Sequence, residues 1–284
     1  MSLIEPLLSD EAFVEEVRRV RASEPGLHLW WLGQSGYLLA WEGRALLLDP
    51  YLSDSLTRKY ANTDKPHVRV SRQVIAPERL TGISVVTTSH NHTDHLDPET
   101  LRPLVSVNPG LRMVCPEANR GTVRERSGLA DDRILGLETS PGRDRVTVDG
   151  FEFWAIPAAH EDLAVDSQGR PIYLGWVIQA GPWKVYHSGD TVLYPGMVAG
   201  LREQRVDVAL LPINGRAPER RVAGNLNGRE AAQVAKAIGA GCVVPGHYDL
   251  FAFNTASPEE FVNTCRVLDQ PYRVLQLGER LTVG

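Results

Sequence analysis

Residues 90–95 read His-Asn-His-Thr-Asp-His, and side chains of these types at this spacing fit the binding of metal ions. The apolar run from 83 to 88 precedes them and predicts a buried strand. Asp97-Pro98 follows them and is typical of a helix start, with an N-cap residue and then proline at the first helical position. We therefore expect the six residues to form a loop between a strand and a helix.

This loop has enough ligand side chains for two ions. In an extended loop His90 and His92 point to the same side and can bind one ion, while Asp94 and His95 turn toward a second position. Two divalent ions lower the pKa of a water molecule, so that hydroxide forms near neutral pH, and one ion polarises the scissile bond. If Asp94 lies beside this water, its carboxylate is the expected proton shuttle to the leaving group.

Further ligands are expected at other strand ends, because a metal ion needs four or more. His160, Asp190 and His247 each follow an apolar run that predicts a strand. Three strand ends that each present one ligand suit a site at the rim of a sheet sandwich, where Asp190 is placed to bridge two ions. The alternative for each residue is a structural role at the rim or in a turn.

Two more polar residues are candidates for supporting the ligands. Asp49 follows the apolar run 46–48, and either orients a metal-binding histidine or caps the turn at Pro50. His187 lies in the predicted strand before Asp190, and we favour a supporting or core role for it over direct ligation. Asp97 is better explained as a helix cap than as a ligand.

Substrate contacts are harder to assign. Arg216, Arg220 and Arg221 lie in one predicted loop and could bind a phosphate or carboxylate, but a solvated loop is at least as good an explanation. Tyr51 and Tyr248 are candidates for lining the pocket, and core packing explains them equally well.

The expected elements fall into two halves, each with strands first and helices later, which predicts two mixed sheets packed face to face with helices outside, an αββα sandwich. We expect one domain over 1–284, with 1–26 as an N-terminal helical extension. The predicted strands cover 27–32, 37–41, 45–48, 83–88, 111–115, 133–137, 146–148, 151–156, 173–179, 183–188, 206–213, 242–245 and 272–277. The predicted helices start near 10, 98, 117, 196, 228 and 258, and Asn225 or Asn227 is expected to cap the helix at 228.

Composition limits the class of protein. The chain has 284 residues, 43% hydrophobic, with a net charge of -5, as in ordinary globular proteins. Three widely spaced cysteines without a Cys-x-x-Cys pair favour a reducing, cytoplasmic setting. The acidic balance argues against nucleic-acid binding and favours a small-molecule substrate. We expect no transmembrane segment and no signal peptide, and both a monomer and a homo-oligomer stay open.

Several motifs together resemble the metallo-beta-lactamase fold superfamily. They are His90-Asn-His-Thr-Asp-His95, Tyr186-His-Ser-Gly-Asp-Thr191, Pro245-Gly-His247, Trp31-Leu-Gly-Gln-Ser-Gly36, Asp49-Pro-Tyr-Leu-Ser-Asp54 and Gly246-His-Tyr-Asp249. Within the superfamily they are most similar to the L-ascorbate-6-phosphate lactonase-like branch, which neighbours the N-acylphosphatidylethanolamine phospholipase D type. The resemblance covers nearly the whole chain from about residue 27.

The resemblance implies a binuclear metallohydrolase. By motif, one metal ion would take His90, His92 and His160, the other Asp94, His95 and His247, and Asp190 would lie between them. The expected activity is cleavage of a lactone or ester bond in a small, anionic substrate. A metal-dependent phosphodiesterase and a metal-binding protein without catalysis are the alternatives. The ligand types suit zinc, manganese or iron.

Overall fold

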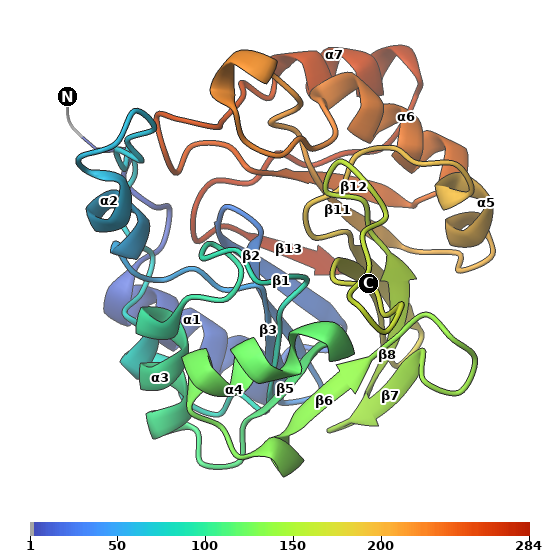
Figure 1. Ribbon diagram of the computed structural model, residues 1–284. Coiled ribbons are helices and arrows are strands. Elements are labelled where there is room, and N and C mark those ends of the chain that lie inside the picture. Colours follow the sequence, from blue (N-terminus) through green and yellow to red (C-terminus); the bar gives the residue numbers. More distant parts are fainter. Residues whose placement is uncertain (1–2) are drawn as a thin grey trace.

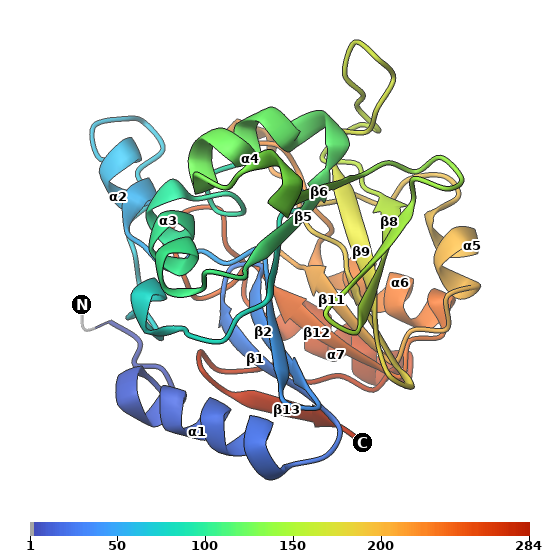
Figure 2. The same ribbon diagram turned by 90° about the horizontal axis from the view of Figure 1, so that it is seen from below.

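The computed structural model describes residues 3–284 and places their strands in two sheets that pack face to face (Figure 1). Helices cover the outer faces: α1, α3 and α4 lie on the first sheet and α5, α6 and α7 on the second (Figure 2). The predicted αββα sandwich with two mixed sheets is therefore confirmed.

The first sheet has seven strands, and β3 to β6 run parallel to one another. In spatial order the strands are β13 (Arg280–Val283), β1 (Leu27–Gly33), β2 (Gly36–Trp41), β3 (Arg44–Leu48), β4 (Val85–Thr87), β5 (Arg112–Pro116) and β6 (Ile134–Leu137). Parallel strands end at the same edge of a sheet, so the loops after β3 and β4 lie on one rim.

The second sheet has six strands, and β10 to β12 run parallel. In spatial order they are β12 (Cys242–Gly246), β11 (Val208–Pro212), β10 (Trp183–His187), β9 (Leu174–Ala180), β8 (Phe151–Pro157) and β7 (Arg145–Val148). The chain leaves β10 and β12 at one rim of this sheet, which is where the polar residues 190 and 247 occur.

Two helices, α3 and α6, begin at side-chain caps. Asp97 accepts a hydrogen bond from the Glu99 amide, as predicted, and Asn227 forms a capping box with Glu230. In residues 3–284 the α-helices are α1 (Asp10–Ser23), α2 (Ser55–Tyr60), α3 (Pro98–Val107), α4 (Arg120–Ser127), α5 (Met197–Arg202), α6 (Gly228–Ile238) and α7 (Glu259–Val267). Short 3-10 turns cover Pro77–Arg79, Glu117–Asn119, Asp131–Arg133 and Pro218–Arg220.

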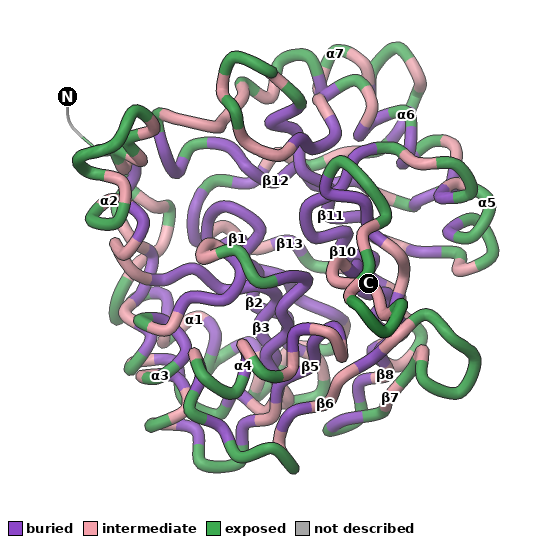
Figure 3. The backbone as a smooth tube through the Cα atoms, viewed as in Figure 1, coloured by how far each residue is buried: buried purple, intermediate pink, exposed green. Residues whose placement is uncertain are grey.

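Apolar residues of both sheets form one continuous core that includes Trp30, Phe153 and Trp176. Figure 3 shows most of the strands as buried backbone, with exposed segments concentrated in the outer helices and loops. Every residue of β1 is buried, because α1 covers the face of the sheet that the second sheet does not. Among residues 3–284, no helix has the length and apolar character needed to cross a bilayer.

One predicted strand is wrong. Tyr272 forms only an isolated bridge to Val243, and the last strand is β13, which pairs with β1 in the other sheet. The segment between them crosses from one sheet edge to the other. Leu275 and Leu277 are buried in the core along the way, so their apolar pattern reflects packing without strand pairing. Helix α2 has no counterpart among the predicted elements.

Candidate metal centre

Four strand ends bring the predicted ligands to one rim. The loop 90–95 follows β4, His160 follows β8, Asp190 follows β10 and His247 follows β12. His247 has a backbone φ of 63°, unusual for a residue with a side chain, and its N–H donates to the Gln34 carbonyl in the turn between β1 and β2. The two sheets therefore hold the site from both sides.

The first group of possible ligands is His90, His92 and His160, whose ring nitrogens lie within 4.8 Å of one another. The Nδ1 of His160 donates to the Gly224 carbonyl at 2.9 Å, which leaves its Nε2 as the free nitrogen. His90 is fully buried and His92 lies at the exposed edge of the group. A metal ion here would have one side open to solvent.

The second group is Asp94, His95 and His247, again with ligand atoms within 4.8 Å. Both histidines are completely buried, while the Asp94 side chain keeps 18% of its surface exposed. The Nε2 of His95 lies 3.6 Å from Asp94 Oδ2. Asp94 is thus the member of this group that reaches solvent.

Asp190 lies between the two groups. Its Oδ1 is 2.8 Å from His247 Nε2 and 3.3 Å from His95 Nε2, and its Oδ2 is 3.7 Å from His160 Nε2. The structure therefore brings together all seven residues predicted as ligands, with Asp190 in contact with histidines of both groups.

The polar atoms at the centre of this arrangement have few partners except one another. The Nε2 atoms of His90, His95 and His247 and the Oδ1 of Asp190 are buried, and apart from the contacts of Asp190 with His95 and His247 they have no polar partner among the described residues. A buried polar atom with too few partners is costly, and four such atoms converging on one place need a shared partner. Divalent cations satisfy donors of this chemistry, so the residues present fit metal ions.

The charges agree with this fit. Burial opposes a charged Asp190, but His247 and His95 lower the pKa of its carboxyl well below the usual value, so it stays ionised. Burial lowers the pKa of His90 well below its usual value, which keeps it neutral. Burial also opposes a charged His95, yet Asp190 and Asp94 raise its pKa well above the ordinary value. The carboxylates favour positive charge at this point, whether a proton or a metal cation supplies it.

Asp49 orients two histidines from behind. Its Oδ2 accepts the Nδ1–H of His95 at 2.7 Å and the hydroxyl of Ser89, and Ser89 Oγ lies 3.0 Å from His90 Nδ1. These bonds place protons on Nδ1, so the Nε2 atoms carry the free lone pairs. The Ser89 hydroxyl fills the space between Asp49, His90 and His95, so that this trio is a hydrogen-bonded support and not a further metal site.

The turn between β1 and β2 contributes a residue that sequence reasoning missed. The amide nitrogen of Gln34 lies 3.2 Å from both Asp94 Oδ2 and His247 Nδ1, linking two possible ligands. His187 Nε2 donates to the carbonyl of Ser35 in the same turn, so it supports the turn, and burial lowers its pKa. The Gly33 to Gly36 run signals a tight turn, but nothing in it indicates that the Gln34 side chain faces the site.

A cavity of about 470 Å³ opens in front of the two groups, and His92, Asp94, His160 and Asp190 line it. Three cationic side chains, Lys59, Lys65 and Arg126, also line it. Each of them donates to a neutral acceptor. Lys59 donates to Thr93 Oγ1 and Lys65 to the Arg221 carbonyl. Arg126 donates to the carbonyls of Asn91 and Leu96. Within residues 3–284, none of the three forms an ion pair with a carboxylate.

The residues predicted to contact substrate lie elsewhere. None of Arg216, Arg220, Tyr51 and Tyr248 lines this cavity. Arg216 pairs with Glu230, and Arg220 donates to Asn254 and to the carbonyls of residues 214 and 215. Both tyrosines are buried and have other partners. The Tyr51 hydroxyl accepts from the Leu56 amide, and the Tyr248 ring stacks on Trp31. Arg221, the third arginine of that loop, pairs with Asp64 on the surface.

One signal in the sequence could have indicated the cationic side of the cavity. The chain has 30 basic residues, of which only four are lysines, and two of these four, Lys59 and Lys65, are cavity residues. His67 joins them there, with its ring stacked on Tyr60 at 4.5 Å. The three residues belong to the 55–67 segment that includes α2, which sequence reasoning left without a predicted element.

Comparison with known proteins agrees with this geometry. Residues 44–248 match the model of the beta-lactamase superfamily domain. A metal-dependent hydrolase of Methanoculleus marisnigri is 29% identical over 265 residues, covering 91% of this chain and 97% of the relative. A metal-dependent hydrolase of Caldivirga maquilingensis is 28% identical, covering 87% and 93%, respectively.

Solved structures share the fold. An isothiocyanate hydrolase from Delia radicum gut bacteria superimposes with a TM-score of 0.70 at 18% identity, covering 90% of this chain and 99% of that one. A metallo hydrolase from Ignicoccus hospitalis gives a TM-score of 0.64 at 22% identity, covering 91% and 98%. At these identities the likeness concerns the fold alone.

Proposed function

The chain belongs to the beta-lactamase superfamily and is a metal-dependent hydrolase, and from this we propose that it uses two divalent ions to cleave an ester or lactone bond in a small anionic substrate. The observation that carries the proposal is the convergence of buried ligand atoms from both sheets, which have few polar partners except one another. Zinc, manganese and iron(II) all accept such histidine and carboxylate donors.

The assignment of ligands follows the two groups. His90, His92 and His160 would hold one ion, Asp94, His95 and His247 the other, and Asp190 both. Two ions bound in this way supply an activated water and polarise the bond to be cleaved. The hydrogen bonds from Nδ1 of His95 and His160 fix the tautomers that such binding requires.

Asp94 is the proposed catalytic proton carrier. Its Oδ2 accepts from Gln34, whereas no hydrogen bond from residues 3–284 reaches its Oδ1, and the side chain lines the cavity. From this place Oδ1 takes the proton of the attacking water and passes it to the leaving oxygen. We expect Asp94→Asn to lose most turnover, since an amide cannot accept that proton.

The charge of the substrate is inferred from Lys59, Lys65 and Arg126. Three cations without carboxylate partners face a cavity of about 470 Å³, and an anionic group of the substrate would satisfy them. A phosphodiester is the second candidate, because these cations and a two-metal site suit its charge equally well. The free cysteines, Cys115, Cys242 and Cys265, support a cytoplasmic setting.

The test combines metal analysis with turnover. The protein is assayed as purified, after chelation and after metal is restored, with a lactone, an aryl ester and bis(p-nitrophenyl) phosphate. We expect activity with the lactone or the ester that follows metal content, and loss of metal in His90→Ala. His28→Gln is the matched control, since His28 is a buried histidine that bonds to Thr282 outside the site. Full activity after complete metal removal would refute the proposal. Cleavage of the phosphodiester alone would select the second candidate, and bound metal without turnover would indicate a metal-binding protein.

A further inference from the structure

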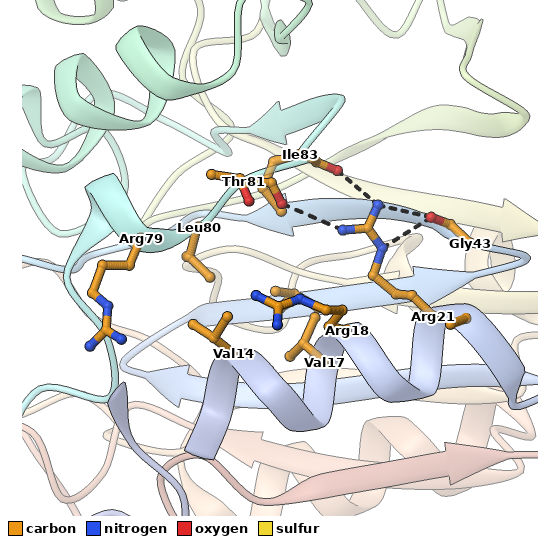
Figure 4. A pocket seen from close by; sticks show the side chains of 12 residues that line it. Val14, Val17, Arg18, Arg21, Gly43, Arg79, Leu80, Thr81 and Ile83 are labelled. Carbon is orange, nitrogen blue, oxygen red and sulfur yellow. Dashed lines mark hydrogen bonds between the residues drawn. The ribbon is translucent and has the colours of Figure 1, made fainter. Parts of the chain in front are cut away.

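A second cavity, of about 350 Å³, lies between α1 and the first sheet (Figure 4). It is separate from the metal centre: Ile83, just before β4, lines the cavity, whereas the metal-binding loop follows the other end of β4. The β2–β3 turn at Gly43 forms part of its wall, and the β1–β2 turn that contacts the metal centre is at the opposite end of β2. A ligand in this cavity would therefore not reach the hydrolytic site.

The floor of the cavity is apolar. Its lining includes Val14 and Val17 of α1, Leu38 of β2, and Leu80 and Ile83 from the segment before β4. Except for Val14, these side chains are nearly or fully buried in the core, so the floor is rigid. A pocket of a few hundred Å³ with apolar walls and few polar groups is typical of a small-ligand site.

The mouth of the cavity carries uncompensated positive charge. Arg21 donates to the carbonyls of Gly43 and Gly82, and Gly82 has no side chain where the guanidinium lies: a Cβ there would come within 3.0 Å of Arg21 Nη1. These acceptors are neutral, and within residues 3–284 neither Arg18 nor Arg21 pairs with a carboxylate. Burial lowers the pKa of Arg21, and the negative charge of Asp149 opposes this shift only in part.

The third arginine makes a useful contrast. Arg79 also lines the cavity, but it pairs with Asp10 and Glu11 at the start of α1. Its charge is thus neutralised, whereas Arg18, whose guanidinium lies beside Val14 in Figure 4, has no ion pair among the described residues. Arg21 is held by backbone carbonyls, so Arg18 is the cation that is available to a ligand. A cation of this kind over an apolar floor matches a ligand with one anionic group and an apolar chain.

We propose that this cavity binds an amphiphilic monocarboxylate of the medium-chain fatty-acid type, with the alkyl chain on Val14 and the accessible edge of Val17, and the carboxylate at Arg18. The carboxylate would also lie in the positive field of Arg21, whose own hydrogen bonds hold it in place. This site is independent of the proposed hydrolysis, because it shares no residue with the metal centre.

Titration calorimetry with octanoate tests the proposal on the whole protein, with octan-1-ol and butanoate as probes for the charge and for the chain. We expect saturable binding of one octanoate. Octan-1-ol should bind about tenfold more weakly, the effect of one charge-assisted hydrogen bond. Butanoate should bind more weakly still, since each methylene removed costs up to about fourfold.

Variants locate the site. Arg18→Gln should weaken octanoate binding about tenfold and leave octan-1-ol unchanged, and Val14→Phe should weaken both by filling the cavity. Arg19→Gln is the matched control, because Arg19 is the next residue of α1 and pairs with Glu16 and Glu24 outside the cavity. Octanoate can also bind metal, so the titrations are repeated after chelation. Any of three results would overturn the proposal. The first is no binding of octanoate, and the second is equal binding of octan-1-ol and octanoate. The third is octanoate binding that chelation abolishes and that Arg18→Gln does not affect.

Discussion

Replacing Asp49 by asparagine tests whether the support behind the histidines controls metal binding. The carboxylate is completely buried and accepts hydrogen bonds from four donors. Its Oδ1 accepts from Thr87, its Oδ2 accepts from Ser89 Oγ and His95 Nδ1, and the Ser89 backbone N–H donates to both oxygens. Asparagine can keep an oxygen at the place of Oδ1, but it must then present its NH₂ group at the place of Oδ2. The Ser89 hydroxyl can turn away, but His95 must move its proton to Nε2, the atom that faces the metal centre.

The structure allows the size of the effect to be worked out. A hydrogen bond to a charged group contributes about 1.5–3 kcal/mol. Losing the bond from His95 to Asp49 should therefore weaken metal binding about 10- to 100-fold, the range usual for residues that orient a metal ligand. The pair is fully buried, so solvent screening reduces the effect little. The fold should persist, since the oxygen of the introduced amide would still accept the hydrogen bond from the Ser89 backbone N–H.

The assay is competition for metal with a chromophoric chelator, with circular dichroism to verify folding. Thr87→Val is the matched control: it removes a hydrogen bond at 3.0 Å to Oδ1 of the same carboxylate but leaves the bond to His95 intact. In the metal-free protein, ¹⁵N shifts of His95 report directly which ring nitrogens carry protons and do not depend on metal affinity. Equal metal affinities for Asp49→Asn and Thr87→Val, with His95 still protonated on Nδ1, would refute this reasoning.

Three further predictions concern other parts of the molecule. Lys59→Gln together with Lys65→Gln should raise KM for an anionic substrate with little change in kcat, and an unchanged KM would contradict a role of these cations in binding. Asn227→Ala should lower the free energy of unfolding by about 1 kcal/mol in urea titrations, because it removes the capping box of α6, and a change near zero would speak against that cap. Burial raises the pKa of Cys115 to about 12, so folding favours the thiol and stability should fall as pH rises from about 9 toward 12. Cys115→Ala should show a shallower alkaline decline, and parallel curves would refute this assignment.

The ligand residues were predictable because their signals are local and chemical. A strand, a His-x-His-x-Asp-His loop and a capped helix are consecutive in the sequence, and His160, Asp190 and His247 each follow an apolar run that ends at the rim. Most strand positions were predictable for the same reason. The segment 272–277 was not, because strand pairing depends on which edge the chain reaches, and that choice is made by contacts far along the sequence.

The surroundings of the ligands could not be predicted in the same way. Gln34 reaches Asp94 across 60 positions and His247 across 213, so only the folded sandwich brings them together. The Arg216 loop had the more obvious cluster of cations, yet its charges are used by Glu230, Asp64 and backbone carbonyls. Counting cations in a sequence overlooks these partners. The same count gives no particular weight to Lys59 and Lys65, which line the cavity and form no ion pair within residues 3–284.

The electrostatics of the site therefore differ from those of the whole chain. The protein has a net charge of -5, and three carboxylates, Asp49, Asp94 and Asp190, lie at or behind the proposed metal positions. Two divalent ions would exceed the charge of these carboxylates by one, and the lysines and Arg126 add positive charge at the cavity wall. Without metal, an anionic substrate would be repelled by the carboxylates of the metal centre and attracted by the cations of the cavity wall. With metal bound, both the metal centre and the cavity wall would attract it. Substrate affinity should consequently depend on metal content even for an unreactive analogue with the same anionic group. Equal affinity of such an analogue for the chelated and the metal-restored protein would show that the rim alone binds the anion.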